Sequence, residues 1–286
     1  MSTDAPSVFK TVFDSTPLND GLYFFLQEVY RLYPEDQFHY VIAVATREKK
    51  TDEDIYKKIL ADLPAIKPFL SRLTWFLPAL RKQKKELGRQ TVELLGGRKV
   101  IEGYLEIGSG GKYVSEIKRH VKVKGNIFLM DDITGSNTFK DAFENGQLKK
   151  PAQSILPAHL PISSSNIDGE SLDVVTCYTG LHHCPHDLLD NLMPSVHRVL
   201  RKGGLFIIRE YDVRTQAMET LVSLILSIFN LVSNTSWEKE AKEFRSFRPI
   251  DDWSDFISSF GFEDSGKRLL QEKDASNNTL VAFTKL

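Results

Sequence analysis

The sequence predicts an α/β protein in which a helical region precedes a parallel β-sheet. Two observations carry this prediction. From about residue 100 onward, short apolar segments typical of strands alternate with segments of helical periodicity. The first of these strands runs into YLEIGSGGKY at residues 104–113, where an acid is followed by three glycines. We therefore expect a helical extension or cap over residues 1–95 and an α/β domain over residues 96–286.

The helical extension is predicted from its periodicity and its capping residues. Residues 18–33 repeat apolar side chains on one helical face. The segment that begins at Thr51 opens with a capping hydroxyl and early acids, which suit the positive end of a helix. Three prolines are then expected to break the chain into short pieces, namely Pro64, Pro68 and Pro78. Gly96 and Gly97 mark the expected end of the extension.

The strands of the α/β domain are expected at five apolar segments followed by a terminal pair. In chain order the five are GYLEIG, NIFLMDD, QSILPA, SLDVVTCYT and GLFIIRE, and the terminal pair is DSGKRLLQ with NNTLVAFTKL. Helices are expected at KYVSEIKRHV, FKDAFENG, DLLDNLMPSVHRVL and PIDDWSDFISSFGF. An insertion at about residues 213–248 carries an apolar helix from Leu221 to Val232, which is shorter than the roughly 20 residues that span a bilayer.

Composition and charge argue against several classes of protein. The 286 residues carry 37 basic and 38 acidic side chains, and the resulting formal charge of −1 provides no broad field for a polyanion such as DNA. The two cysteines, Cys177 and Cys184, form no disulfide framework and favour a reducing compartment. The amino terminus shows no secretory signal. We therefore expect a cytoplasmic protein without a transmembrane segment.

The glycine turn after the first strand indicates the kind of ligand. In an open parallel sheet, ligands bind beyond the carboxyl ends of the strands, and glycine lets the backbone approach them. A dinucleotide fingerprint would place a third glycine at Tyr113, and a phosphate loop would place Ser or Thr after Lys112. Glu106 at the strand end would repel a diphosphate, yet it suits a ligand with a cationic amino group and a sulfonium. These features favour S-adenosylmethionine.

Residues 100 to about 210 resemble the core of the class I S-adenosylmethionine-dependent methyltransferases. Four motifs occur in the family's order: YLEIGSGG, DDIT, SLDVVTCYTGLHHCPH and HRVLRKGGLFIIRE. The third motif contains LeuHisHis, and it resembles the same tract in family members that methylate small-molecule acceptors. The resemblance implies a Rossmann-like, seven-stranded, mostly parallel sheet with helices on both faces and an antiparallel last strand.

The resemblance also implies a set of cofactor-binding residues. The first motif supplies four of them, namely Glu106, Gly108, Ser109 and Gly110. Asp132 is the favoured partner of the ribose, and Asp131 stays an alternative. The remaining contacts are expected around the third and fourth strands, at Ala158, His159, Tyr178 and Thr179.

Two positions depart from the family's pattern. Lys112 stands where the family often has a glycine, and Leu156 stands where many members carry an acid that binds the adenine amino group. Backbone groups around Ala158 and His159 would then hold the adenine.

Histidines dominate the segment after the fourth strand. Adjacent histidines normally point in different directions, and no second Cys or His cluster lies at ligand spacing, so no metal is expected. Because histidine titrates near the working pH, His182 and His183 are the candidate catalytic bases for a hydroxyl or acidic carbon. The alternative is that these histidines shape the loop through backbone hydrogen bonds.

The sequence therefore predicts an S-adenosylmethionine-dependent methyltransferase that acts on a small or medium-sized organic acceptor by O-, N- or C-methylation. The insertion at residues 213–248 is expected to form a helical lid, and its apolar helix makes a hydrophobic acceptor one option. An RNA or protein methyltransferase remains an alternative, supported by the basic run from Arg81 to Arg89. A catalytically silent, partner-binding module is a second alternative.

Overall fold

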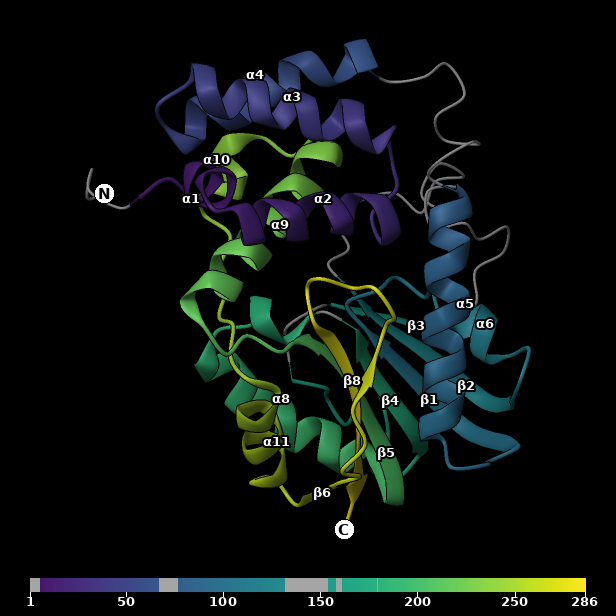
Figure 1. The fold of residues 1–286 in the computed structure, drawn as a ribbon. Coiled ribbons are helices and arrows are strands. Elements are labelled where there is room, and N and C mark those ends of the chain that lie inside the picture. Colours follow the sequence, from purple (N-terminus) through teal and green to yellow (C-terminus); the bar gives the residue numbers. More distant parts are fainter. Residues whose placement is uncertain (1–5, 67–76, 132–153, 158–160, 179) are drawn as a thin grey trace. The chain divides into compact units, whose positions relative to one another are not determined.

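The computed structural model describes residues 6–66, 77–131, 154–157, 161–178 and 180–286 (Figure 1). The chain folds into two compact units. The first unit combines Met1–Leu80, Val213–Glu243 and Glu272–Asn277. The second unit combines Arg81–Asp212, Phe244–Gln271 and Asn278–Leu286. The expected boundary after residue 95 lies within the second unit, directly after a helix.

The first unit is helical in its described residues. Its helices are α1 (Val8–Asp14), α2 (Thr16–Glu28), α3 (Glu35–Glu48), α4 (Asp52–Ile66), α9 (Gln216–Val232) and α10 (Trp237–Glu240). The apolar helix expected near residues 221–232 is α9, and it contacts α1, α2 and α4. Its buried side chains, including Leu224 and Ile228, join one core with residues of α1 to α4 such as Leu22 and Ile42. None of the described helices is both long and apolar enough to cross a membrane.

Two of the three prolines lie inside helices. Pro64 lies inside α4, two residues before its last described residue Ile66, and its missing N–H costs the helix one hydrogen bond, that to the carbonyl of Leu60. Pro78 is the second residue of α5 (Leu77–Leu94), where no intrahelical partner for its missing N–H is required. The expectation that the chain breaks at Pro64 is therefore wrong, whereas Pro78 at the start of α5 does not contradict the expected break before the basic run. Pro68 lies outside the described residues.

The second unit contains the predicted sheet. Its strands are β1 (Val100–Ile107), β2 (Lys122–Asp131), β3 (Ser154–Pro157), β4 (Leu172–Tyr178), β5 (Leu200–Tyr211), β6 (Phe262–Asp264), β7 (Leu269–Leu270) and β8 (Asn278–Lys285). Seven strands follow the order β3-β2-β1-β4-β5-β8-β6, and the short β7 pairs with β8. The pairs from β3 to β5 are parallel, and β8 runs antiparallel to β5. The predicted seven-stranded, mostly parallel sheet is confirmed.

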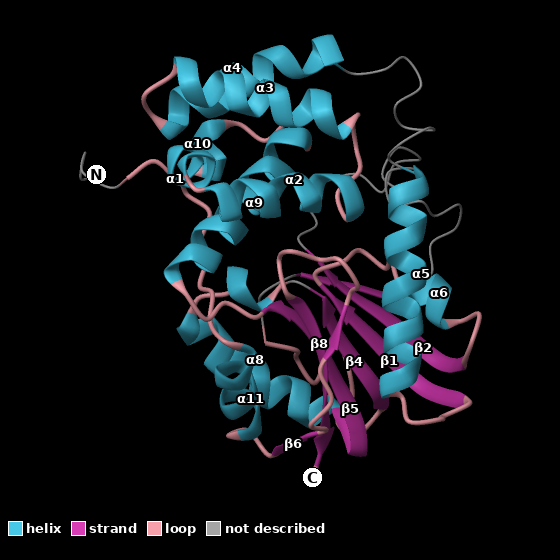
Figure 2. Ribbon diagram, viewed as in Figure 1, coloured by secondary structure: helices cyan, strands magenta, loops and turns pink. Residues whose placement is uncertain are grey.

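Helices cover both faces of this sheet (Figure 2). Besides α5 they are α6 (Val114–Ile117), the single 3-10 turn η2 (Leu181–His183), α8 (His186–Val199) and α11 (Ile250–Ser258). Because successive strand residues point to opposite faces, Val175 of β4 belongs to the core beside α8 and α11, whereas Val174 belongs to the core beside α5 and α6. The predicted helix at FKDAFENG lies outside the described residues.

Candidate active site

The predicted site residues gather at the carboxyl ends of two neighbouring strands. β1 and β4 are paired in parallel, with Glu106 opposite Thr176 and Ile107 opposite Cys177. The backbone amide of Gly108 donates to the carbonyl of Met130 at 2.8 Å, which fixes the start of the turn against β2. Parallel pairing thus brings the glycine turn and the histidine segment to the same edge of the sheet.

The glycine turn requires its glycines. Gly108, Gly110 and Gly111 have φ angles of 76°, 58° and 76°, in the left-handed region that other residues rarely adopt. A side chain at Gly108 would begin 4.0 Å from the Cα atom of Gly180, so the turns after β1 and β4 approach each other closely. The amide of Lys112 donates to the carbonyl of Ser109 at 3.1 Å and closes the turn.

Glu106 is a buried acid beneath this turn. Its side chain is 0% exposed, and its Oε2 atom accepts a hydrogen bond of 3.2 Å from the hydroxyl of Tyr104. Its Oε1 atom has no hydrogen-bond partner among the described residues. Burial raises the pKa of Glu106 to about 7, and the Tyr104 hydroxyl, the backbone amides of Tyr113 and Gly111 and the charge of Lys112 oppose the rise. A ligand with a cationic N–H group would satisfy the unpaired oxygen and favour the ionised carboxylate.

Buried hydroxyl groups link Glu106 to α5. The hydroxyl of Tyr104 lies 2.7 Å from Oγ1 of Thr176, and the hydroxyl of Tyr178 lies 2.9 Å from Oγ1 of Thr91 on α5. Tyr178 is 2% exposed, and burial raises its pKa. The helix also places Lys84 near Glu106, and burial lowers the pKa of Lys84. The polar environment of Glu106 is therefore built from α5 as well as from the strands.

Replacing Tyr178 by Phe is expected to lower the free energy of unfolding by about 1–2 kcal/mol, because Thr91 loses a buried hydrogen-bond partner. Urea unfolding of Tyr178→Phe, Thr91→Val and the double variant measures this effect. A positive coupling energy of about 1 kcal/mol between the two sites is expected for residues in direct contact. Strict additivity would contradict a stabilising role for this contact.

His182 and Glu210 form a buried pair on the other side of the site, after β4 and at the end of β5. Nδ1 of His182 lies 2.6 Å from Oε2 of Glu210, and the two side chains are 1% and 0% exposed. The other carboxylate oxygen of Glu210 accepts hydrogen bonds from the backbone amides of Gly180 at 3.1 Å and Leu181 at 2.7 Å. Nε2 of His182 has no hydrogen-bond partner among the described residues. Nδ1 of the imidazole therefore has a hydrogen-bond partner, whereas Nε2 can accept or donate a bond to a ligand.

Aromatic rings hold the imidazole of His182 in place. The rings of Tyr211 and Phe247 lie 5.2 and 5.5 Å away between centroids, and the ring of His183 lies 4.1 Å away. The carbonyl of His182 accepts a hydrogen bond of 2.8 Å from the amide of Ser246. His183 is less buried than His182, and its Nδ1 lies 3.3 Å from the carbonyl of Phe244. The two candidate bases thus differ, because the paired carboxylate belongs to His182.

The other predicted site residues are described in part. Oγ of Ser109 donates to the carbonyl of Ile107 at 3.4 Å, so it turns back toward β1. The backbone of Asp131 ends β2 opposite Pro157, and its side chain lies outside the described part. Four predicted residues also lie outside it, namely Asp132, Ala158, His159 and Thr179. No group of three or more potential metal ligands occurs among the described residues.

Three buried polar residues beside the site are not among the predicted site residues. Glu210 is one of them, and its position at the end of β5, beside β4, is a signal that places it near the acceptor side without indicating a role. Thr91 and Lys84 gave no such signal, because polar residues of a basic helix are usually solvated. Their burial follows from the packing of α5 on the sheet.

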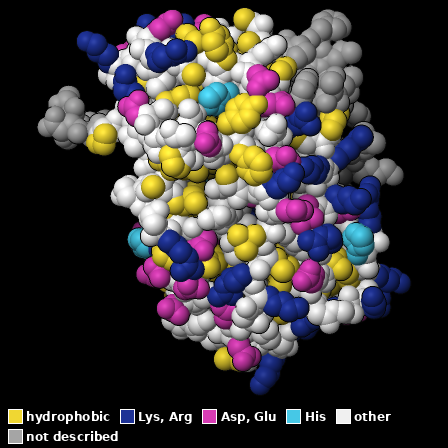
Figure 3. Space-filling model, viewed as in Figure 1, with side chains coloured by type: hydrophobic (Ala, Val, Ile, Leu, Met, Phe, Trp, Pro, Cys, Tyr) yellow, Lys and Arg dark blue, Asp and Glu magenta, His cyan; other side chains and the backbone are white. Residues whose placement is uncertain are grey.

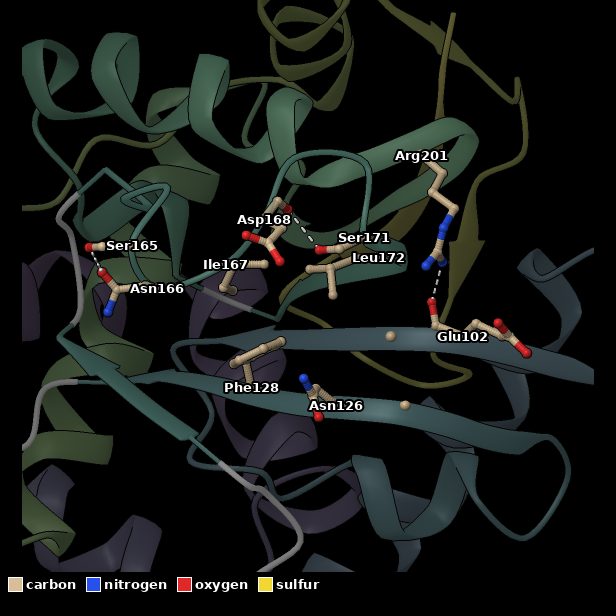
Figure 4. Close-up of a pocket in the computed structure, with 12 residues that line it drawn as sticks. Glu102, Asn126, Phe128, Ser165, Asn166, Ile167, Asp168, Ser171, Leu172 and Arg201 are labelled. Atoms are coloured by element: carbon tan, nitrogen blue, oxygen red, sulfur yellow. Dashed lines mark hydrogen bonds between the residues drawn. The ribbon is translucent and has the colours of Figure 1, made fainter.

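A separate cavity lies at the opposite ends of the strands. It has a volume of about 400 Å³ and is lined by residues near the amino ends of β1, β2 and β4, including Glu102, Asn126 and Leu172 (Figure 4). The guanidinium of Arg201 donates to the carbonyl of Glu102 and to Asp173 beside it. This cavity is remote from Glu106 and His182 along the strands, so it is not the cofactor site.

A comparison with protein families identifies the domain that carries the site. Residues 105–208 match the family model described as "Methyltransferase domain". These residues therefore form a methyltransferase domain of the S-adenosylmethionine-dependent class I type. The chain has the activity of that domain, methyl transfer, with S-adenosylmethionine as the cofactor. No curated protein matches the chain in sequence.

Solved methyltransferase structures resemble the chain at low sequence identity, and two with TM-scores above 0.5 share its fold. The pyocyanin biosynthetic protein PhzM is 12% identical with a TM-score of 0.53, and the match covers 96% of this chain and 74% of that chain. The CurJ carbon methyltransferase is 15% identical with a TM-score of 0.51, over 93% of this chain and 70% of that chain. A 1,6-didemethyltoxoflavin-N1-methyltransferase from Burkholderia thailandensis is 14% identical with a TM-score of 0.45, over 71% and 78% of the two chains.

The residues at the glycine turn fit this cofactor. Oε1 of Glu106, which has no partner in the part of the chain that the structure describes, is suited to the cationic amino group of the cofactor, and the left-handed glycines leave the backbone open to it.

Proposed function

We propose that the chain methylates a small or medium-sized organic acceptor on oxygen, nitrogen or carbon. One observation carries the proposal. Two buried polar atoms, Oε1 of Glu106 and Nε2 of His182, have no hydrogen-bond partner among the described residues, and they lie at the carboxyl ends of the adjacent parallel strands β1 and β4. Buried polar atoms are normally paired, and unpaired ones are costly, so this edge of the sheet is suited to polar ligands that complete both atoms.

The cofactor side of the proposal rests on the first motif. Glu106, Gly108 and Gly110 would bind the amino-acid end of S-adenosylmethionine, with Ser109 closing the turn. A direct contact from Tyr178 to the cofactor stays a prediction. The contacts to the ribose and the adenine also stay predictions, and the residues expected to make them are Asp131, Asp132, Ala158, His159 and Thr179. When bound, the cofactor supplies a methyl group activated by a sulfonium.

The acceptor side rests on the histidine segment. His182 is the preferred base over His183, because Glu210 and two aromatic rings hold its imidazole while Nε2 stays open. A base near the reacting atom contributes by taking the proton that the acceptor loses. Alignment of the acceptor and exclusion of water supply much of the remaining rate enhancement in such a transfer.

A macromolecular substrate is less well supported. Lys and Arg side chains gather over the region of α5, as expected from the basic run (Figure 3). Within that run, Arg89 is paired with Glu86 at 2.8 Å and with Glu93 at 3.3 Å, which reduces the local positive charge. DNA is not expected as a partner. The lid at residues 213–248, the hydrophobic acceptor and the cytoplasmic location stay predictions.

Calorimetric titration with S-adenosylmethionine and S-adenosylhomocysteine tests the proposal. Gly108→Arg is expected to weaken binding at least 100-fold, because a large side chain in a left-handed position fills the turn and strains it. Gly266→Arg is the matched control, since Gly266 has a φ of 70° with open space around it and lies far from the site in the sequence. Asp132→Ala tests the predicted ribose contact in the same assay.

The outcomes separate the enzyme from the partner-binding module. Binding by the wild type and by Gly266→Arg, but not by a folded Gly108→Arg, supports the cofactor site and justifies a screen of acceptors. A folded wild type that binds neither compound overturns the methyltransferase function and favours the silent module.

A further inference from the structure

Arg248 packs its guanidinium over two aromatic rings of α11. The guanidinium carbon lies 4.3 Å from the centre of the Trp253 ring and 5.6 Å from the centre of the Phe256 ring. Such packing restricts the guanidinium, and its N–H groups point outward from the edge of its plane. Arg248 is therefore a partly buried cation with a restricted orientation.

Among the described residues, the one hydrogen-bond partner of this guanidinium is another basic side chain. Nη2 of Arg248 lies 3.0 Å from Nδ1 and 3.4 Å from Nε2 of His186, the first residue of α8. Because a guanidinium has only donors, the ring nitrogen of His186 must accept. The contact leaves the positive charge of Arg248 uncompensated, and no described carboxylate forms an ion pair with it.

The uncompensated charge of Arg248 has a cost, because it is partly removed from water. Burial lowers the pKa of Arg248, and the charges of Asp252 and Glu210 oppose that shift without an ion pair. Asp252 is exposed, and Glu210 already binds His182. Charged groups away from water are normally paired, so this position is suited to an anion from outside the chain.

The backbone places Arg248 beside the proposed acceptor side. Its backbone pairs with that of Asp212, directly after β5. The residues that precede these two, Tyr211 and Phe247, lie with their rings 5.2 and 5.5 Å from the ring of His182. The uncompensated guanidinium thus belongs to the same end of the sheet as the candidate base.

We propose that Arg248, together with His186, binds a carboxylate or phosphate group of the acceptor. The inference rests on the proposed function for the place of the acceptor, and it narrows the acceptors to organic anions. A guanidinium donates two parallel hydrogen bonds to such a group, because its planar fork matches the spacing of the oxygens. A neutral His186 that accepts from Arg248 carries its proton on the other ring nitrogen and can donate a further bond.

Saturation-transfer NMR of the full chain, saturated with S-adenosylhomocysteine, tests this anion site with simple probes. Benzoate is the organic anion, and benzamide is its neutral counterpart of nearly the same shape. Inorganic phosphate, followed by its ³¹P signal, is an anion without an organic part. We expect benzoate to bind about 10-fold or more tightly than benzamide, since hydrogen bonds to charged groups are the stronger ones.

Variants of Arg248 assign that preference to its guanidinium. Arg248→Met keeps a long side chain over the rings and should weaken benzoate binding by about 10- to 100-fold, with benzamide unchanged. Arg248→Lys keeps the charge without the planar fork and should recover part of the loss. Arg89→Met is the matched control, because it removes an exposed guanidinium that Glu86 already pairs on α5. If Arg248→Met fails to fold, the wild type and Arg248→Lys decide the test.

An identified acceptor gives a second readout. With a methylated acceptor that carries a carboxylate or phosphate, Arg248→Met should raise KM about 10- to 100-fold with little change in kcat, because the contact serves binding. An enzyme that methylates the neutral analogue as efficiently as the anion would contradict the proposed class of acceptor.

The binding results separate this inference from the proposed function. A wild type that binds benzoate no more tightly than benzamide overturns the anion site, as does a folded Arg248→Met variant with unchanged benzoate binding. Arg248 then only covers Trp253. Binding of phosphate without benzoate overturns the assignment to the acceptor and indicates a site for a free anion. Failure of the folded wild type to bind S-adenosylhomocysteine overturns the proposed function instead, whatever the anions do.

Discussion

Raising the pH from 5 to 8 is expected to lower the free energy of unfolding of the ligand-free protein by about 3 kcal/mol through Glu106 alone. Burial raises the pKa of this acid from 4.5 to about 7 in the folded state. Between these two values the folded protein binds one proton more than the unfolded chain. The stabilisation is therefore complete below about pH 4.5 and is lost as the pH rises to about 7.

The tyrosines near Glu106 do not titrate across this window. Burial raises the pKa values of Tyr104, Tyr113 and Tyr178 above their ordinary value of 10. The two lysines whose charges act on Glu106, Lys84 and Lys112, come from α5 and from the turn. Because burial lowers the pKa of Lys84, a control must separate the titration of Lys84 from that of Glu106.

Urea unfolding of the wild type and of Glu106→Gln across this pH range measures the effect. The variant keeps the shape of the side chain but has no proton to lose, so its stability should fall less with pH by about the same 3 kcal/mol. Equal pH dependence in both proteins would contradict the assignment to Glu106. A cationic ligand that favours the ionised carboxylate should also release up to one proton on binding, seen as a binding enthalpy that depends on the buffer.

Replacing Trp253 by Ala is expected to lower the free energy of unfolding by about 3–5 kcal/mol. Trp253 of α11 is 0% exposed and belongs to the core between the sheet, α8 and α11. The guanidinium carbon of Arg248 lies 4.3 Å from the centre of its ring, so the truncation also removes a cation–π contact. The large cavity and the lost contact act in the same direction.

Urea unfolding followed by far-UV circular dichroism measures this loss without relying on tryptophan fluorescence. Trp253→Phe retains an aromatic ring in the same cavity and should cost clearly less than Trp253→Ala. A loss below about 1 kcal/mol for the alanine variant would mean that the core closes around the missing ring.

The fold was predictable because its signals are local. The alternation of strand and helix from residue 100 and the glycines after β1 depend on residues close together in the chain. The orientation of side chains across neighbouring strands has no such signal. Glu210 is 28 residues after His182, and their contact follows from the pairing of β4 with β5 and from the turn that follows β4.

The contribution of α5 to the site was unpredictable for a different reason. Lys84 belongs to a basic run, and in a sequence such a residue looks solvated, yet it is 8% exposed. Gly88 allows this packing, because a side chain there would begin 2.5 Å from Cγ of Glu116 on α6. The close approach of the two helices buries polar residues that have no apolar pattern of their own.

The discontinuous first unit has a consequence for synthesis on the ribosome. Its first segment ends at Leu80, and its second begins at Val213, more than 130 residues later. At roughly 5–20 residues per second, α1 to α4 emerge about 7–30 seconds before α9 does. During that interval, apolar side chains that share a core with α9 are only partly buried, among them Leu22, Leu26 and Ile42. Chaperone binding to the nascent chain is expected in this interval, before the last helices of the unit arrive.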